Sequence, residues 1–170
     1  MGSVPELRPG DIAPDLTLRN QFGETVELTA LAGSPVVVMF YPFAFSRVCG
    51  AELTEVHRRW DEFQQVGAVL LAVSCDAVHT LRAYADHLSS TAVGEQEERA
   101  REERVGLHLL SDFWPHGAAA QRYGAFNPDT GAPQRISFLV DAHSRVAHQV
   151  ASENGEARSL DHTLELLRSM

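Results

Sequence analysis

Residues 36–49 read Val36-Val37-Val38-Met39-Phe40-Tyr41-Pro42-Phe43-Ala44-Phe45-Ser46-Arg47-Val48-Cys49, an apolar run that leads into a short loop and a cysteine. A continuous apolar run bounded by turn residues is typical of a strand covered on both faces of its sheet. The loop opens a stretch with helical spacing, so we expect Cys49 at the start of a helix. Unpaired backbone N–H groups and the positive end of the helix dipole stabilise an anion there. The sequence therefore predicts that Cys49 is a thiolate nucleophile.

The stretch after Cys49 predicts an amphipathic helix, because its apolar residues recur at spacings of three and four. These residues are Leu53, Val56, Trp60 and Phe63. The charged residues between them are expected to be left largely to solvent. They are Glu52, Glu55, Arg58, Arg59, Asp61 and Glu62.

The remaining segments predict an α/β fold. Apolar runs recur at residues 68–74 and 136–140, with helical patterns between them. Further helices are predicted at residues 79–88, 116–123 and 160–168. Two hairpins are predicted, one from residues 15–19 with 25–28 and one from residues 136–141 with 145–151. A short helical turn is expected at residues 28–32.

A chain of 170 residues with 44% hydrophobic content can form one domain with a sizeable core, so we expect a single domain over residues 1–170. The segment from Gly94 to Arg104 is nearly all charged, with opposite charges four residues apart. It is expected to be a solvated helix or a mobile loop, within a charged insertion at about residues 90–105. A tolerated surface insertion is favoured over a partner-docking segment, because a longer loop costs little closure entropy.

Pro42, Ser46 and Cys49 fill the pattern P-x-x-x-[ST]-x-x-C, which resembles the active-site signature of the peroxiredoxins. The resemblance extends over nearly the whole chain, through residues 10–15, 111–117 and 134–141. Within the family, the chain is most similar to the one-cysteine alkyl hydroperoxide reductase E type. Residues 41–45 and 114–117 and the lack of a usual resolving cysteine indicate this type. The resemblance implies a thioredoxin-like fold, with a central mixed sheet flanked by helices and an N-terminal hairpin, although the region between Asp86 and Leu107 looks longer than usual.

The resemblance also implies a reaction and the residues that perform it. A peroxiredoxin reduces hydrogen peroxide or an organic hydroperoxide with a thiol, so Cys49 is expected to become a sulfenic acid, without metal, haem, flavin or another cofactor. Ser46 is implied as the hydroxyl that contacts thiolate and peroxide, and Pro42 as a rigid apolar wall over the sulfur. Arg135, at the start of a late strand, matches the family arginine whose guanidinium favours the thiolate and donates to the peroxide oxygens.

Each of these residues also has a simpler interpretation. Cys49 alone could be a small buried hydrophobe, although the strand before it, the helix after it and the late arginine disfavour this. Ser46 could be only a helix cap, and Arg135 without the motif would be a surface ion-pair residue. Asp112 and Glu52 could orient groups near the site, but a helix cap or a solvated helix residue is the commoner role for each.

The second cysteine, Cys75, follows the strand predicted at residues 68–74 and is expected at the edge of the sheet where sites collect. A disulfide with Cys49 needs Cα atoms within about 7 Å, so an atypical two-cysteine peroxiredoxin that uses Cys75 is an alternative. A bystander role is favoured, because the family position is not a usual resolving cysteine. Reduction of oxidised Cys49 by an external thiol or redoxin is then expected.

Two other functions are alternatives. A thiol-disulfide oxidoreductase is disfavoured, because Cys49-Gly50-Ala51-Glu52 lacks the second cysteine of a C-x-x-C motif. A non-catalytic redox sensor or binding module could use the same fold, because function resides in the site and not in the fold. A fast reaction with peroxide distinguishes a peroxidase from such a module, which would be oxidised only at the rate of free cysteine.

The composition narrows the expected partners and location. The net charge of −9, without a basic stretch among aromatic residues, disfavours nucleic acid. The longest apolar run, residues 35–45, is too short to cross a membrane, and two cysteines suit a reducing compartment, so a cytoplasmic protein is expected. The eight histidines lack metal-binding spacing, so no metal is expected. The family resemblance favours a homodimer formed near the active-site loop.

Overall fold

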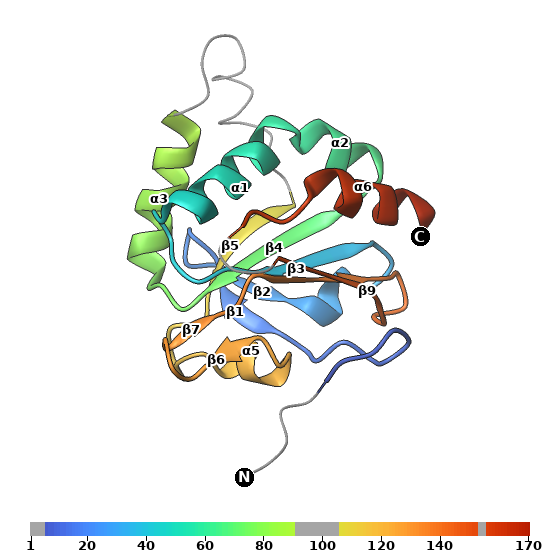
Figure 1. Ribbon diagram of the computed structural model, residues 1–170, viewed down its shortest axis with the longest axis horizontal. Coiled ribbons are helices and arrows are strands. Elements are labelled where there is room, and N and C mark those ends of the chain that lie inside the picture. The colour runs from blue at the N-terminus through green and yellow to red at the C-terminus, as the bar shows by residue number, and fades with distance from the viewer. Residues whose placement is uncertain (1–5, 91–105, 153–155) are drawn as a thin grey trace.

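The computed structural model describes residues 6–90, 106–152 and 156–170 (Figure 1). The described strands are β1 (Thr17–Arg19), β2 (Thr25–Glu27), β3 (Val36–Phe40), β4 (Val69–Ser74), β5 (Leu107–Ser111), β6 (Phe126–Asn127), β7 (Ala132–Pro133), β8 (Ile136–Val140) and β9 (Val146–Ala151). The described helices are η1, a 3-10 turn (Leu28–Leu31), α1 (Arg47–Arg58), α2 (Trp60–Gln65), α3 (Val78–Ser90), α5 (Ala118–Arg122) and α6 (Leu160–Ser169).

A seven-stranded mixed sheet forms the centre of the molecule, in the order β2-β1-β5-β4-β3-β8-β9. Figure 1 shows α1, α2, α3 and α6 on one face of this sheet and α5 on the other. The short strands β6 and β7 pair with each other, on the side of α5. The sheet is therefore covered on both faces, as an apolar central strand requires.

The side chains of β3 alternate between two cores. Val37 and Met39 belong to the core beneath α1, α3 and α6, whereas Val36 and Val38 belong to the core against η1 and α5. β3 runs parallel to β4 and antiparallel to β8. The carboxyl end of β3, where the loop to α1 begins, therefore lies beside the amino end of β8.

The α/β class, the central mixed sheet and the N-terminal hairpin predicted from the sequence are confirmed. β1 pairs with β2 and β8 pairs with β9, both antiparallel. The apolar runs predicted as strands are β3, β4 and β8. The helices predicted at residues 79–88, 116–123 and 160–168 correspond to α3, α5 and α6.

The elements differ from the prediction in several places, and the short strands β6 and β7 are not predicted at all. The sequence pattern does not predict β5, because His108 interrupts its apolar run. The helix expected to begin at Cys49 begins at Arg47 and ends at Arg58. Arg59 then leaves the helical conformation (φ −106°, ψ 20°) before α2 begins at Trp60. Cys49 therefore lies within the first turn of α1, where the helix dipole still acts.

The charged insertion predicted at about residues 90–105 lies outside the described residues, apart from Ser90 at the end of α3. Within the described ranges, no helix has both the length and the apolar content needed to span a membrane. The longest of these helices, α3, has 13 residues, whereas a spanning helix needs about 20.

Candidate active site

Cys49 lies in the first turn of α1, just beyond the carboxyl end of β3. Ser46 precedes the helix with an extended backbone (φ −69°, ψ 149°), and its Oγ accepts a hydrogen bond from the Cys49 N–H at 3.3 Å. Serine favours this N-cap position because it satisfies one of the unpaired N–H groups of a helix start. Cys49 is only 1% exposed. The helix dipole therefore acts on a thiol that is shielded from bulk water.

Arg135 reaches this thiol from the start of β8, the strand that pairs with β3 on the edge away from β4. It directly precedes β8, and the β3–β8 register pairs Met39 with Ser137, so Arg135 lies near the carboxyl end of β3. Arg135 Nη1 donates a hydrogen bond to Cys49 Sγ at 3.0 Å. The same Nη1 donates to Glu52 Oε1 at 3.2 Å. Sheet pairing therefore brings a guanidinium to a cysteine that is far away in the sequence.

A second arginine, Arg158, binds the other carboxylate oxygen of Glu52. Arg158 Nε donates to Glu52 Oε2 at 2.7 Å. Its Nη1 donates to the Phe40 carbonyl at 2.6 Å and to the Ser137 hydroxyl at 3.2 Å. Burial lowers the pKa of Arg158, and the charge of Glu52 opposes that shift. One carboxylate on α1 thus joins two guanidinium groups, and one of these is anchored to β3 and β8.

The expectation that Glu52 is left to solvent is wrong, because Glu52 is 6% exposed. It lies three residues after Cys49 and therefore on the same face of the helix, which is turned toward the sheet. A buried carboxylate is tolerated there because two arginines neutralise it. The helical spacing of Glu52 from Cys49 is a usable sequence signal, whereas Arg158 stands alone in a polar segment and offers none.

Asp112, the other carboxylate considered for the site, caps a helix. Its two oxygens accept hydrogen bonds from the N–H groups of Ala119 and Ala120, at 3.0 and 2.9 Å. These N–H groups belong to the first turn of α5, where intrahelical partners are lacking. Asp112 therefore has the commoner of the two roles that the sequence left open.

The loop between β3 and α1 is held by contacts to β4 and α3. The carboxylate of Asp76, which follows β4, accepts a hydrogen bond from the Ala44 N–H at 2.8 Å. Phe45 has a φ of 64°, a left-handed conformation that is uncommon for a residue other than glycine. Its ring packs on that of Tyr84 in α3, with centroids 4.9 Å apart. These contacts position the start of α1, and the sequence gives no signal for Asp76 or Tyr84.

Three of the four residues predicted for the site are joined by hydrogen bonds, namely Cys49, Ser46 and Arg135. The fourth, Pro42, opens the loop after β3 and is half-buried. In the described part of the chain, no group of three His, Cys, Asp or Glu side chains is placed to hold a metal ion. The arrangement offers the chemistry of a buried thiol beside a positively charged hydrogen-bond donor.

Cys75 lies on the other face of the sheet. Cys75 and Cys49 are both free thiols. Along β4, Leu71 and Val73 face the core on the α5 side, and the alternation of a strand places Cys75 on that side too. Its thiol interacts there with the backbone of Gly117, and burial raises the pKa of Cys75 to about 12. Cys49 belongs to the opposite core, so the sheet separates the two thiols.

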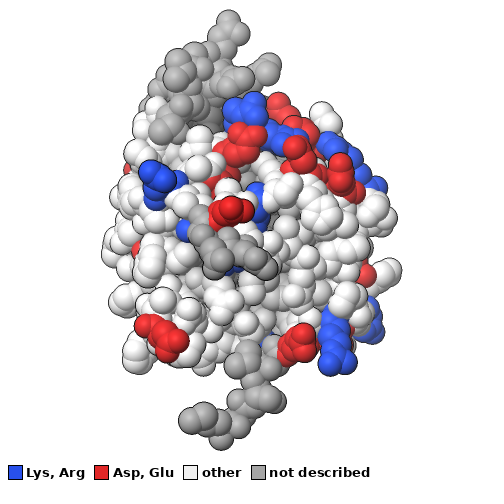
Figure 2. Space-filling view, viewed as in Figure 1, with Lys and Arg blue, Asp and Glu red and all other residues white. Residues whose placement is uncertain are grey.

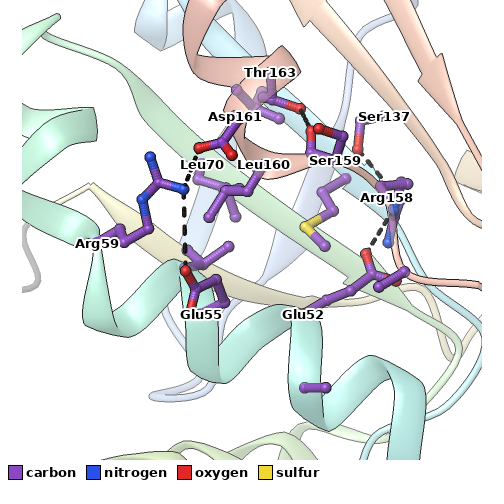
Figure 3. A pocket seen from close by; sticks show the side chains of 15 residues that line it. Glu52, Glu55, Arg59, Leu70, Ser137, Arg158, Ser159, Leu160, Asp161 and Thr163 are labelled. Carbon is purple, nitrogen blue, oxygen red and sulfur yellow. Dashed lines mark hydrogen bonds and ion pairs between the residues drawn. The ribbon is translucent and has the colours of Figure 1, made fainter.

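A cavity of about 280 Å³ lies between α1, α6 and the sheet (Figure 3). Glu52 and Arg158 stand at one end of it. At the other end, Arg59 lies 4.0 Å from Glu55 and 2.6 Å from Asp161. The described lining residues include Glu52 but not Cys49. The cavity therefore touches the site through the ion pair and not through the thiol.

Basic and acidic side chains are interleaved over the helical side of the molecule (Figure 2). Arg58 pairs there with Glu55 at 2.5 Å, and Arg59 pairs with Asp161 at 2.6 Å and with Glu62 at 2.7 Å. Arg168 pairs with the same Glu62 at 3.0 Å. Exposed pairs of this kind add little stability. They do place a carboxylate next to each of these three arginines.

Known proteins are similar to this chain in both sequence and fold. The model of the AhpC/TSA family matches residues 9–149. Alkyl hydroperoxide reductase E of Mycobacterium tuberculosis (strain ATCC 25618 / H37Rv) is 33% identical over 153 residues, which cover 89% of this chain and 90% of that protein. Peroxiredoxin Bcp of Escherichia coli (strain K12) is 30% identical over 144 residues, 84% of each chain.

Solved structures agree with the sequence comparison. The crystal structure of peroxidoxin BcpB from Mycobacterium tuberculosis matches with a TM-score of 0.77 at 28% identity, over 97% of this chain and 99% of that one. The crystal structure of Enterococcus faecalis AhpC shares the fold, with a TM-score of 0.77 at 21% identity, over 97% of this chain and 92% of that one. The predicted thioredoxin-like fold and the resemblance to alkyl hydroperoxide reductase E are thus confirmed. The chain belongs to the AhpC/TSA family of peroxiredoxins, whose members are thiol peroxidases.

Proposed function

We propose that this chain reduces hydrogen peroxide or organic hydroperoxides through a sulfenic acid on Cys49. The thiolate sulfur attacks one peroxide oxygen, so that an S–O bond forms as the O–O bond breaks. The sulfur loses the two electrons that the peroxide gains. The proton released when the thiol ionised returns to the departing oxygen, which leaves as water or as an alcohol.

The observation that carries this proposal is the 3.0 Å hydrogen bond from Arg135 Nη1 to Cys49 Sγ. A guanidinium favours the thiolate, and its remaining N–H groups suit the oxygens of a bound peroxide. A low-dielectric site strengthens both effects, and Cys49 is 1% exposed. In this proposal Ser46 adds a hydroxyl next to the sulfur, and Pro42 shields the site from water.

The sulfenic acid is then reduced by an external thiol or a redoxin. The placement of Cys75 supports this, because its thiol interacts with the backbone of Gly117 next to α5, whereas Cys49 belongs to the core on the opposite face of the sheet. Burial also raises the pKa of Cys75 to about 12, so its thiol is a poor nucleophile at neutral pH.

We further propose a homodimer formed near the active-site loop. Phe43 and Phe45 in that loop are each 51% exposed, and Phe113 and Trp114 after β5 are 54% and 82% exposed. β3, β4 and β5 are parallel, so the loops that follow them lie at the same edge of the sheet. Large apolar side chains gathered at one edge suit a protein interface. Sedimentation of the wild type and of Trp114→Glu tests this, with a shift to monomer expected for the variant.

The proposal takes the chain as one domain over residues 1–170 that works in the cytoplasm. The seven-stranded sheet contains both the first strand, β1, and the last strand, β9, which supports a single folding unit. Both cysteines are free thiols, which suits a reducing compartment. Limited proteolysis tests the single domain, since a two-domain chain would yield a stable fragment that retains part of the sheet.

Intact mass spectrometry after one equivalent of hydrogen peroxide tests the proposed reaction. Wild type and Cys75→Ser should each gain the mass of one oxygen. A sulfenic-acid reagent should then label both proteins at Cys49. Cys49→Ser should gain none under the same conditions. A loss of two hydrogens in the wild type that Cys75→Ser abolishes would instead show a disulfide between the two cysteines. Oxidation of Cys49 only at the rate of free cysteine would indicate a sensor or binding module.

A further inference from the structure

Tyr84 has a buried hydroxyl group that no side chain or backbone group in the described part of the chain satisfies. It lies in α3, and its side chain is fully buried in the core that also contains Cys49. Within residues 6–90, 106–152 and 156–170, the Tyr84 Oη atom has no hydrogen-bond partner. Most buried polar groups in folded proteins are paired, so an unpaired one requires an explanation.

This hydroxyl points at the first turn of α1. A Cβ atom added to Gly50 would lie 3.9 Å from Tyr84 Oη. Gly50 directly follows Cys49, so the hydroxyl lies against the backbone beside the reactive thiol. The ring of Phe45 covers the Tyr84 ring from the active-site loop, with centroids 4.9 Å apart. The tyrosine is thereby held in place without using its polar atom.

The charges around Tyr84 keep its hydroxyl a hydrogen-bond donor. Burial raises its pKa first, and the negative charge of Cys49 raises it further, with smaller contributions from Asp76 and Glu52. Arg135 opposes these effects. A phenol in this environment stays protonated and can donate to an anionic oxygen nearby.

We propose that Tyr84 donates a hydrogen bond to the oxygen that is transferred from the peroxide to Cys49. Arg135 donates to the sulfur from the side of β8, and Tyr84 faces the same turn of α1 from the side of α3. The hydroxyl is unpaired in the reduced protein because its acceptor arrives with the substrate and remains as the S–O oxygen of the sulfenic acid. This inference rests on the proposed peroxidase function and adds a donor to it.

Tyr84→Phe tests the inference, because it removes the hydroxyl and keeps the ring. The matched control is Tyr123→Phe, since Tyr123 is also buried but belongs to the opposite core and donates to the Pro14 carbonyl at 2.6 Å. In rapid mixing with hydrogen peroxide, Tyr84→Phe should react about 10-fold more slowly than wild type. Tyr123→Phe should stay within about twofold of wild type.

Alkylation of Cys49 by iodoacetamide provides the second measurement. That reaction delivers no oxygen to the sulfur, so Tyr84→Phe should leave its rate unchanged. An equal loss in both reactions would show that the variant disturbs the thiol itself and would overturn the inference. A Tyr84→Phe protein that reacts with peroxide at the wild-type rate would overturn it too. If wild type itself reacted no faster than free cysteine, the proposed function would fail, and this inference with it.

Discussion

Arg158 Nε donates a hydrogen bond to Glu52 Oε2 across 2.7 Å, and both side chains are 3% exposed. The pair ties the segment before α6 to α1. The other oxygen of Glu52 accepts from Arg135, whose Nη1 also reaches Cys49. A residue near the end of the chain thus helps to set the position of the guanidinium at the thiol.

Replacing Arg158 by Met should therefore destabilise the protein strongly. The change keeps much of the apolar stem but leaves Glu52 as a buried carboxylate with one partner fewer, and breaking a buried pair in this way typically costs about 3–5 kcal/mol. Urea unfolding measures the effect. Arg168→Met is the matched control, because Arg168 is half exposed and pairs with Glu62 at the surface, so its loss should change the midpoint little.

The double variant Glu52→Gln/Arg158→Met should recover part of that stability. It removes both charges of the pair, so no unneutralised carboxylate remains in the core. A double variant no more stable than Arg158→Met would show that the cost comes from packing and not from the buried charge. Its peroxide reaction should be slower than that of the wild type, because Arg135 has then lost the carboxylate that orients it.

Substitutions at Ser46 separate its two possible roles. Ser46→Ala removes the acceptor for the Cys49 N–H and should cost about 0.5–2 kcal/mol of stability. Ser46→Asn retains a side-chain acceptor that suits an N-cap but has no hydroxyl. If the hydroxyl takes part in the reaction, the Asn variant should be close to wild type in urea unfolding and slow in peroxide reduction. A fast Asn variant would assign Ser46 to capping alone.

The Cys75 thiol should resist alkylation in the native protein up to alkaline pH. Burial raises its pKa to about 12, and the charges of Asp112 and Asp76 add to the shift. An unfolded chain ionises this thiol near pH 8.5, so the folded state loses stability as the pH rises from about 8.5 toward 12. Cys75→Ala should remove this part of the alkaline destabilisation. The unfolding midpoints of wild type and Cys75→Ala are compared at pH 8 and at pH 10.5. A difference between the two proteins that is the same at both pH values would contradict the shift.

The sequence predicts the framework of the fold because that framework depends on local patterns. The apolar runs of β3, β4 and β8 and the helical spacing after Cys49 each carry their own periodicity. β5 is missed because His108 sits within a short run, and the end of α1 is missed because Arg59 is an ordinary helix former in a helical pattern. The interruption of the helix at Arg59 depends on tertiary contacts, which a local sequence pattern does not contain.

The sequence predicts the candidate-site residues that stand in a motif or next to a recognisable strand. It does not predict the residues that only tertiary contacts bring to the site. Pro42, Ser46 and Cys49 stand in one motif, and Arg135 precedes a recognisable strand. Arg158 and Asp76 have no such context, since they matter only because the fold brings them to Glu52 and to the Ala44 N–H. The burial of Glu52 runs against the general preference of carboxylates for solvent, and only the two arginines explain it.

The most direct test of the central claim measures how fast Cys49 reacts with hydrogen peroxide when Arg135 is changed, in a Cys75→Ser background and by rapid mixing. The parent protein should consume one equivalent far faster than free cysteine does. Arg135→Gln should lose about 100-fold or more in rate, and Arg135→Lys should recover part of it, because an ammonium restores the charge but not the planar set of donors. An Arg135→Gln protein that reacts as fast as its parent would contradict the account.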